Sequence, residues 1–521
     1  MANVNFHPVT ASEVAVSLRQ QVPLVQDTRT RRVGVAAHGV ESAGLTLLGV
    51  LPATYPEWLG DMAFTRAHGL RFAYVGGAMA RGIASTRLVI ELARAGALGF
   101  FGAAGLPPEK VEAAILQITA ALRPEGLAWG SNLIHSPDDP ALEDAVVDLY
   151  LRHGVRRVSA SAFMGLTRAV VRYACTGLQR DDAGAAVRQN HLFAKISREE
   201  VAEQFLSPPP AALLDQLRAE GALTAQEAEL AARLPLASHV TVEADSGGHT
   251  DNRPLNALFP AIMLLRDRLA ARHGYQATVH IGAAGGLGTP AAVAAAFALG
   301  ASYVLVGSVH QAAVESGVSA AARRLLARAG VADVMMTASA DMFERGVRVQ
   351  VLKRGVMMGV RGNQLYELYR RHGSLEEIPA ETRARLEQQV FRQPLDAVWA
   401  ATREFFNRVQ PAQAARAARD PKHRMALVFR WYLGNSSRWP LTGEPGREQD
   451  YQLWCGPAMG AFNSWTQGSF LEAPEAREIR QIVLNFIEGA AIATRAQHLR
   501  SFGVQVAPDA FNPPPARLEI N

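Results

Sequence analysis

The segment VEADSGGHTDNRP (242–254) combines residue types that could do chemistry on a flat ligand. Gly247 and Gly248 allow the backbone to approach a planar ring closely, and His249 follows them with an imidazole that can hold or transfer a proton. A lone histidine is more often a satisfied polar residue. Its place after a Gly-Gly turn at the end of an apolar run nevertheless favours a functional role for His249.

A second segment, GAAGGLGTP (282–290), has the composition of a phosphate-binding loop. Its glycines free backbone N–H groups, and Pro290 is well suited to begin a helix whose positive end faces an anion. One strand later, Gly307-Ser308 leads into another helical pattern. A dinucleotide fingerprint is excluded, because six strand patterns precede the run and the next strand does not end in an acidic residue. The pair of loops predicts a phosphate-bearing cofactor, with a purely structural turn as the alternative.

Three further features add polar or small groups at strand ends. Gly76-Gly77-Ala78-Met79 is small enough for a flat ligand to lie against the backbone, although a tight turn would explain it equally well. Asn132 and Lys195 stand on otherwise apolar strands. A lysine there needs an electron-rich partner, either the polar edge of a flavin or a structural carboxylate.

These residues can act together only if the secondary-structure elements bring them to the same end of the fold. Eight apolar runs alternate with helical patterns between about residues 71 and 320, at 72–76, 97–101, 127–132, 156–161, 191–196, 239–244, 278–282 and 303–307. This alternation and size predict an α/β fold, a (β/α)8 TIM barrel whose active site lies at the carboxyl ends of its strands.

Three ranges describe the predicted domain organisation. Residues 1–70 form an N-terminal cap or part of a second lobe, and 71–330 form the barrel with a helical insertion near 205–235. Residues 331–521 form a mainly helical lobe that is expected to bind substrate or its carrier protein, with long helical patterns at 381–409 and 475–499.

The composition limits the classes of protein to which the chain can belong. The 521 residues are 49% hydrophobic and 19% charged, as in ordinary globular enzymes, and the formal net charge of +5 comes without a long run of like charges. Nucleic-acid binding is therefore weakly supported. Two distant cysteines provide neither a metal site nor a disulfide framework, and no leader or membrane span is recognisable, so we expect a cytoplasmic protein without a metal.

With these residues in place, a family resemblance is evident. The runs at 242–254 and 281–308 resemble the nitronate monooxygenase (2-nitropropane dioxygenase) superfamily of FMN barrels. DMFERGVRVQVLKRG (341–355), LYELYRRHGSLEEI (365–378) and DYQLWCGPAMGAFNSW (450–465) are similar to the PfaD-type family, the trans-acting enoyl reductases of polyketide and polyunsaturated fatty acid synthases.

The resemblance implies a role for each matched residue. It places His249 where the superfamily has its catalytic or substrate-side histidine, which acts as a base in nitronate oxidation and, in enoyl reductases, either takes part in catalysis or positions the nicotinamide. It assigns Lys195 to both catalysis and the flavin's polar edge. The residues implied to bind FMN are Gly77, Ala78, Met79, Asn132, Lys195, Ser246, Gly247, Gly248, Gly285, Gly286, Gly307 and Ser308. Arg81 departs from the pattern, where a smaller polar residue such as Asn is expected.

The implied reaction reduces the α,β-double bond of an acyl chain held on an acyl carrier protein, with FMN as cofactor and NADPH as hydride donor. A flavin-dependent nitronate monooxygenase is the enzymatic alternative, and a catalytically silent assembly-line scaffold is the alternative from another class. The acyl chain, the proton donor and the oligomeric state stay open, a homo-oligomer included.

Overall fold

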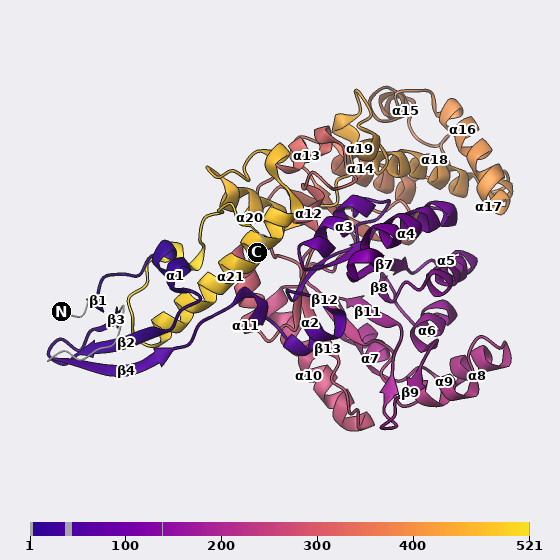
Figure 1. Cartoon of the computed structure of the whole chain (residues 1–521). Helices are drawn as coiled ribbons and strands as arrows, with labels where there is room; N and C mark the ends of the chain where they lie inside the picture. The colour runs from indigo at the N-terminus through magenta and orange to yellow at the C-terminus, as the bar shows by residue number, and fades with distance from the viewer. Residues whose placement is uncertain (1–3, 37–43, 138, 520–521) are drawn as a thin grey trace. The chain divides into compact units, whose positions relative to one another are not determined.

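The predicted barrel is present. The computed structural model describes residues 4–36, 44–137 and 139–519, and eight parallel strands close into one barrel (Figure 1). Its strands are β5 (Tyr74–Gly76), β6 (Leu98–Phe101), β7 (Trp129–Ile134), β8 (Arg157–Ser161), β11 (His191–Ile196), β12 (His239–Glu243), β13 (His280–Ala284) and β14 (Tyr303–Val306). The fold class and all eight predicted strands are confirmed, with ends that differ by no more than a few residues.

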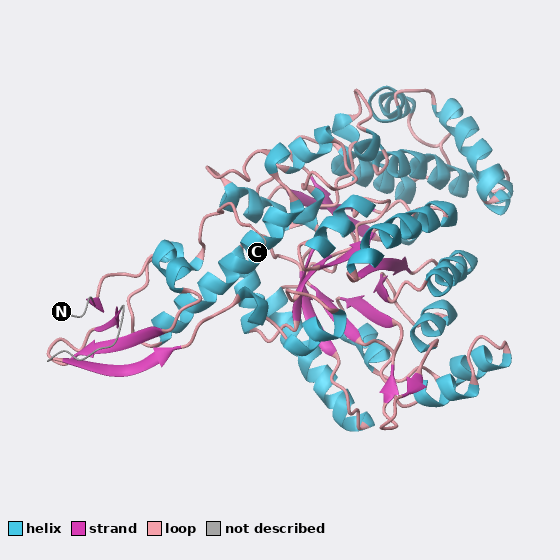
Figure 2. Ribbon diagram, viewed as in Figure 1, coloured by secondary structure: helices cyan, strands magenta, loops and turns pink. Residues whose placement is uncertain are grey.

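Strand β14 pairs with β5 and thereby closes the barrel, with Val304 opposite Tyr74. Large apolar side chains fill its interior, among them Phe64, Phe100, Phe193 and Tyr303. The strands are nearly continuous apolar runs because one face meets these side chains and the other meets the surrounding helices (Figure 2).

The surrounding helices follow the strands in the expected alternation. They are α3 (Thr86–Arg94), α4 (Pro108–Leu122), α5 (Pro140–His153), α6 (Arg168–Cys175), α7 (Glu199–Leu206), α10 (Leu255–His273) and α11 (Pro290–Ala298). The insertion near 205–235 contains two short helices, α8 (Ala211–Ala219) and α9 (Ala225–Ala231). Gly221, at φ +70°, separates them, and Thr224 caps α9 through a reciprocal hydrogen-bond pair with Glu227.

The amino-terminal region forms an antiparallel sheet in the order β1 (Val4–Asn5), β3 (Val33–Ala36), β2 (Val22–Asp27), β4 (Leu45–Leu51). The long carboxyl-terminal helix α21 (Ile479–Ser501) lies beside it (Figure 1). Buried Arg495 of α21 donates hydrogen bonds to the carbonyl oxygens of Leu18, Gln20 and Pro52. Helix α21 also contacts α11, where a Cβ on Gly489 would lie 2.7 Å from Pro290.

A second compact unit comprises residues 317–460 together with Ser246–Thr250. It contains the hairpin β15 (Val334–Ala338) and β16 (Arg348–Leu352) and a set of helices that includes α13 (Ala320–Leu326), α14 (Met358–Arg371), α16 (Leu395–Val409) and α18 (Pro421–Ser436). The helical pattern predicted at 381–409 is interrupted by a π-turn, Glu387–Phe391, and by Pro394.

The two compact units divide the chain differently from the boundaries expected from sequence. Residues 1–245, 251–316 and 461–521 form one unit, so the carboxyl-terminal segment belongs with the barrel rather than with the helical lobe. The physical reason is α21, whose apolar surface is buried against α11 and α3. Among the described residues, no helix is both long enough and apolar enough to cross a membrane.

Candidate active site

The loop after β13 has the geometry of a cradle. Gly285 and Gly286 have φ of +91° and +73°, a conformation that favours glycine. A Cβ on Gly285 would lie 2.7 Å from the backbone of Ala244, so this glycine permits close packing on the segment after β12. A Cβ on Gly286 would meet no atom within 4 Å. The backbone at Gly286 therefore faces open space that a ligand could fill.

Helix α11 begins at Pro290, as the sequence predicted, and Thr289 caps it by accepting a hydrogen bond from the backbone N–H of Ala292 at 3.2 Å. After β14, Gly307 likewise faces open space, and Ser308 is the first residue of α12 (Ser308–Gln311). The phosphate group of a nucleotide such as FMN fits this combination of open backbone and a helix start.

The loop after β5 packs tightly on its neighbour. The N–H of Gly77 donates to the carbonyl oxygen of Val306 at 2.9 Å, and a Cβ on Gly77 would lie 2.6 Å from Leu305. The small residues after β5 thus lie beside the end of β14. Arg81 in this loop adopts φ +58°. Asparagine tolerates this conformation better than arginine, which agrees with the expectation of a smaller polar residue at this position.

Asn132 and Lys195 already have protein partners. The Asn132 side chain is buried and accepts a hydrogen bond from the N–H of Ala104 at 3.2 Å, which fixes the loop after β6. Lys195 Nζ lies 2.8 Å from Glu243 Oε1, with side chains 23% and 12% exposed. The carboxylate alternative for Lys195 is therefore observed, and its contact with a flavin stays a prediction.

His249 has a directed hydrogen-bond chain behind it. Its Nε2 lies 3.4 Å from Ser339 Oγ and 3.7 Å from Asp341 Oδ2, and the Ser339 hydroxyl donates to Asp341 Oδ1. Because the hydroxyl proton goes to Asp341, Ser339 accepts from His249, which places the proton of the neutral imidazole on Nε2 and the lone pair on Nδ1. The imidazole is therefore oriented with Nδ1 as its proton-accepting atom.

Asp341 is suited to support a positive charge on that imidazole. Partial burial alone would raise the pKa of its carboxyl, but His249 and Ser339 outweigh burial and hold the pKa well below its usual range. Asp341 is therefore ionised at neutral pH and places a negative charge 3.7 Å from His249 Nε2.

The Ser246–Thr250 segment is bound within the second unit. Gly248 forms a bridge with Gln350, with N–H to O distances of 3.0 and 2.8 Å, and Gln350 Nε2 donates to Ser246 O at 2.7 Å. A Cβ on Gly247 would lie 2.7 Å from the backbone N of Cys455. The structure thus brings Gly77, Gly285, Gly286, Gly307 and Ser308 to neighbouring strand ends of the barrel unit, and groups Ser246–His249 with β16.

Sequence reasoning missed Glu243, Ser339 and Asp341. Glu243 ends a strand adjacent to that of Lys195, so charge pairing across neighbouring strands was an available signal. Ser339 and Asp341 lie about ninety residues from His249 in sequence, and no spacing rule links them.

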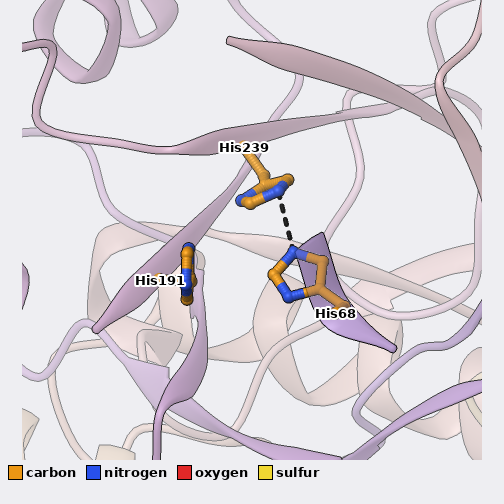
Figure 3. A group of neighbouring side chains, drawn as sticks. All are labelled: His68, His191 and His239. Carbon is orange, nitrogen blue, oxygen red and sulfur yellow. Dashed lines mark hydrogen bonds between the residues drawn. The ribbon is translucent and has the colours of Figure 1, made fainter. Parts of the chain in front are cut away.

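A histidine cluster lies at the opposite ends of the strands. His191 and His239 begin β11 and β12, His68 ends α2 (Met62–His68), and one ring nitrogen of each lies within 4.8 Å of the others (Figure 3). Such a trio could ligate a metal ion, which the sequence did not predict. Burial keeps all three neutral, lowering the pKa of His68 to about 2 and that of His191 to about 4.

The hydrogen bonds of this cluster argue for a structural role. Arg157 Nε can only donate, so His68 Nδ1 accepts at 3.0 Å and the His68 proton is on Nε2. That proton is directed to His239 Nε2, 3.0 Å away (Figure 3). Two of the three histidines, His68 and His239, thus have their facing nitrogen atoms engaged with each other, beside the cationic guanidinium of Arg157. We therefore interpret the cluster as a neutral polar network at the amino-terminal face of the barrel, where residues serve stability.

The fold and loops together define a (β/α)8 barrel in which the backbone at Gly286 and Gly307 faces open space at the carboxyl ends of the last strands. The nitronate monooxygenase family matches residues 65–360, more than half of the chain. The chain belongs to this family. Residues 372–451 also match the inserted helical domain of [acyl-carrier-protein] S-malonyltransferase.

Individual relatives agree with the resemblance predicted from sequence. The chain is 45% identical over 87% of its length to one of the polyunsaturated fatty acid synthase proteins of Thraustochytrium sp., covering 30% of that protein. It is 43% identical over 82% of its length to the polyketide biosynthesis protein PksE of Bacillus subtilis, covering 55% of it. The chain thus spans well under two thirds of these relatives.

The chain also matches one solved structure, over nearly the whole length of that structure. The enoyl reductase domain of MlnA, from the macrolactin biosynthesis cluster of Bacillus amyloliquefaciens, is 36% identical, with a TM-score of 0.81. The match covers 85% of this chain and 99% of that domain. Because the barrel unit alone is smaller than the matched share of the chain, the similarity extends into both compact units.

Proposed function

We propose that this protein is an FMN-dependent enoyl reductase that reduces the α,β-double bond of an acyl thioester on an acyl carrier protein, with NADPH as the hydride donor. The observation that carries the proposal is the match to 99% of an enoyl reductase domain at 36% identity. When bound, FMN would supply the hydride-transfer chemistry that links NADPH to the β-carbon of the substrate, and a proton added at the α-carbon would complete the reduction.

The barrel's own residues would bind and orient the cofactor. Gly285, Gly286, Gly307 and Ser308 would hold its phosphate, because the open backbone there leaves room for an anion. Gly77, Ala78 and Met79 would contact the flavin ring. Asn132 would act by holding the loop after β6, and Lys195 would turn from Glu243 to the ring's polar edge.

His249 would donate a proton to the substrate. In its doubly protonated form the transferable proton is on Nδ1, while Nε2–H stays bound to Ser339 and Asp341 stabilises the charge. Ser246, Gly247 and Gly248 would set the position of this imidazole through their bonds to β16.

The acyl carrier protein is proposed as partner on two grounds. Curated relatives are named as polyketide and polyunsaturated fatty acid synthesis proteins, and part of the helical unit resembles an insertion in a transferase named for acyl carrier protein.

An anaerobic experiment tests the proposal. Purified protein should be yellow, its visible absorbance should bleach on adding NADPH, and a crotonyl-type thioester should restore the colour with formation of the saturated product. A protein that oxidises nitronates in air and does not respond to NADPH would instead be a nitronate monooxygenase. Colourless protein that binds carrier but turns over neither substrate would support the scaffold alternative.

A further inference from the structure

The second compact unit contains a cavity that the proposed reaction in the barrel does not use. It has a volume of about 260 Å³ and lies between the turn after the π-helix, the end of α18 and the loop that follows α19 (Trp439–Thr442). The described residues that line it are Phe391, Arg392, Gln393, Trp431, Asn435, Arg438, Trp439, Glu444 and Arg447. All of them belong to the second compact unit.

The lining is cationic. It contains three arginines and one carboxylate, Glu444. Two of the arginines share a buried aspartate, with Arg447 Nη1 at 3.0 Å and Arg392 Nη2 at 3.4 Å from Asp450 Oδ2. Asp450 is also bound by Arg361 and by the Tyr432 hydroxyl, so its negative charge is already compensated several times. The cavity therefore carries an excess of positive charge.

Arg438 is the arginine best placed to bind a ligand. Its guanidinium forms no ion pair within 4.0 Å in the described chain, and the residue is exposed at the cavity. Gln393 adds an amide group to the same wall. A planar guanidinium with a neighbouring amide donor matches the oxygen atoms of a phosphate group.

Aromatic rings provide the other walls. Phe391 and Trp431 have ring centroids 6.2 Å apart, and Trp431 lies 6.3 Å from Trp439. The guanidinium of Arg447 stacks over Trp439 at 4.5 Å, which holds that ring in place. Phe391 is fully buried and Trp439 is only 5% exposed, so Trp431 is the ring that can pack against the organic body of a ligand whose charged end meets Arg438.

The backbone beside the cavity is also unusual. Glu387–Phe391 form a π-turn, and Arg392 immediately after it has φ +58°, a conformation that is costly for arginine. Both features cluster at functional sites. The conformation directs Arg392 towards the Gly446 carbonyl and Asp450, at the edge of the cavity.

We propose that this cavity binds a phosphate ester, with the phosphate on Arg438 and Gln393 and the organic body against Trp431. The site lies in a different compact unit, and in a different part of the sequence, from the proposed phosphate-binding loops of the barrel. The proposal does not depend on the reductase activity. A free metabolite and a phosphate-bearing prosthetic arm share this chemistry.

The experiment measures binding to the full chain as purified, by calorimetry and by tryptophan fluorescence. Phenyl phosphate and 4′-phosphopantetheine represent the two sources, and phenol and pantetheine are their counterparts without phosphate. We expect saturable binding of at least one phosphate ester, with no more than weak binding of its counterpart. Preference between the two esters identifies the source.

Variants locate the site. Arg438→Gln is expected to weaken binding about ten-fold or more, because it removes a charge-assisted contact and the two arginines that remain are paired with Asp450. Arg403→Gln, which removes an exposed arginine of α16 outside the cavity, should leave binding unchanged. Trp431→Phe should retain calorimetric binding while reducing the fluorescence change.

Equal affinity for ester and counterpart, or equal loss in Arg438→Gln and Arg403→Gln, would overturn the proposal. Binding that disappears in Gly286→Asp but persists in Arg438→Gln would assign the probe to the barrel cradle and overturn it as well. None of these outcomes depends on turnover, so failure of the reductase proposal remains distinguishable.

Discussion

The chain from His249 through Ser339 to Asp341 makes a residue-level prediction. His249→Ala should lower turnover of an acyl-thioester substrate roughly 10²–10⁴-fold, the range for a lost acid–base group, while flavin content stays at the wild-type level. Steady-state rates together with flavin absorbance per protein measure both quantities. Unchanged rates would remove His249 from the mechanism.

Asp341→Asn is the matched variant for the same chain, because it keeps the shape and removes the charge. Its expected effect on turnover is smaller than that of His249→Ala, because the Ser339 hydroxyl keeps an oxygen acceptor and only the charge behind the imidazole is lost. A purely structural role for Asp341 would lower the free energy of unfolding and leave turnover unchanged.

Gly286→Asp tests the barrel cradle. The new carboxylate would extend into the open space at Gly286, repel a bound phosphate and occupy a positive φ. We expect loss of most of the flavin, measured by extraction and chromatography. Gly286→Ala adds bulk without charge and should lose less. Extraction of FAD from the wild type, or full occupancy in Gly286→Asp, would contradict the assignment.

At the scale of elements, the amino ends of β11 and β12 are joined to α2 by neutral histidines, which predicts a dependence of stability on pH. The folded pKa values of His68 and His191, about 2 and about 4, lie below the unfolded value of about 6.5. The unfolded chain therefore binds more protons below pH 6.5. Stability from these groups is fully present above pH 6.5 and decreases as pH falls.

Urea unfolding between pH 7.5 and 5 measures this effect. The loss in the free energy of unfolding should approach roughly 2 kcal/mol per histidine at pH 5, before most carboxylates titrate. His191→Phe should reduce the slope against pH whatever its effect on absolute stability. A free energy of unfolding that is constant across this range would show that the histidines are not buried and neutral.

At the scale of the whole molecule, the net charge of +5 bears on the proposed partner. Carrier proteins are usually acidic, and steering by many charges acts on association and weakens with ionic strength, although single exposed pairs contribute under about 1 kcal/mol. We expect kcat/KM for a carrier-bound enoyl substrate to fall as salt rises, whereas the same acyl group on a small thioester responds little. Equal efficiency and equal salt response for both substrates would exclude docking.

Sequence by itself determined the barrel and the local backbone of the loops at its strand ends. Strand runs such as 191–196 could be predicted because both faces of a parallel strand are buried, and Gly286 and Pro290 could be placed because local backbone rules specify a turn and a helix start. The amino-acid pattern of His249 after Gly247-Gly248 likewise indicated a site without any structure.

Only the tertiary structure decided the partners of those residues. Glu243 beside Lys195, Asp341 behind His249 and Arg438 at its cavity depend on chain segments that meet after folding. The same holds for α21, which joins the barrel unit although it follows the helical lobe in sequence. Local propensity sets turns and strands within a few residues, whereas long-range packing selects contacts by the apolar surface they bury, and no sequence period encodes that choice.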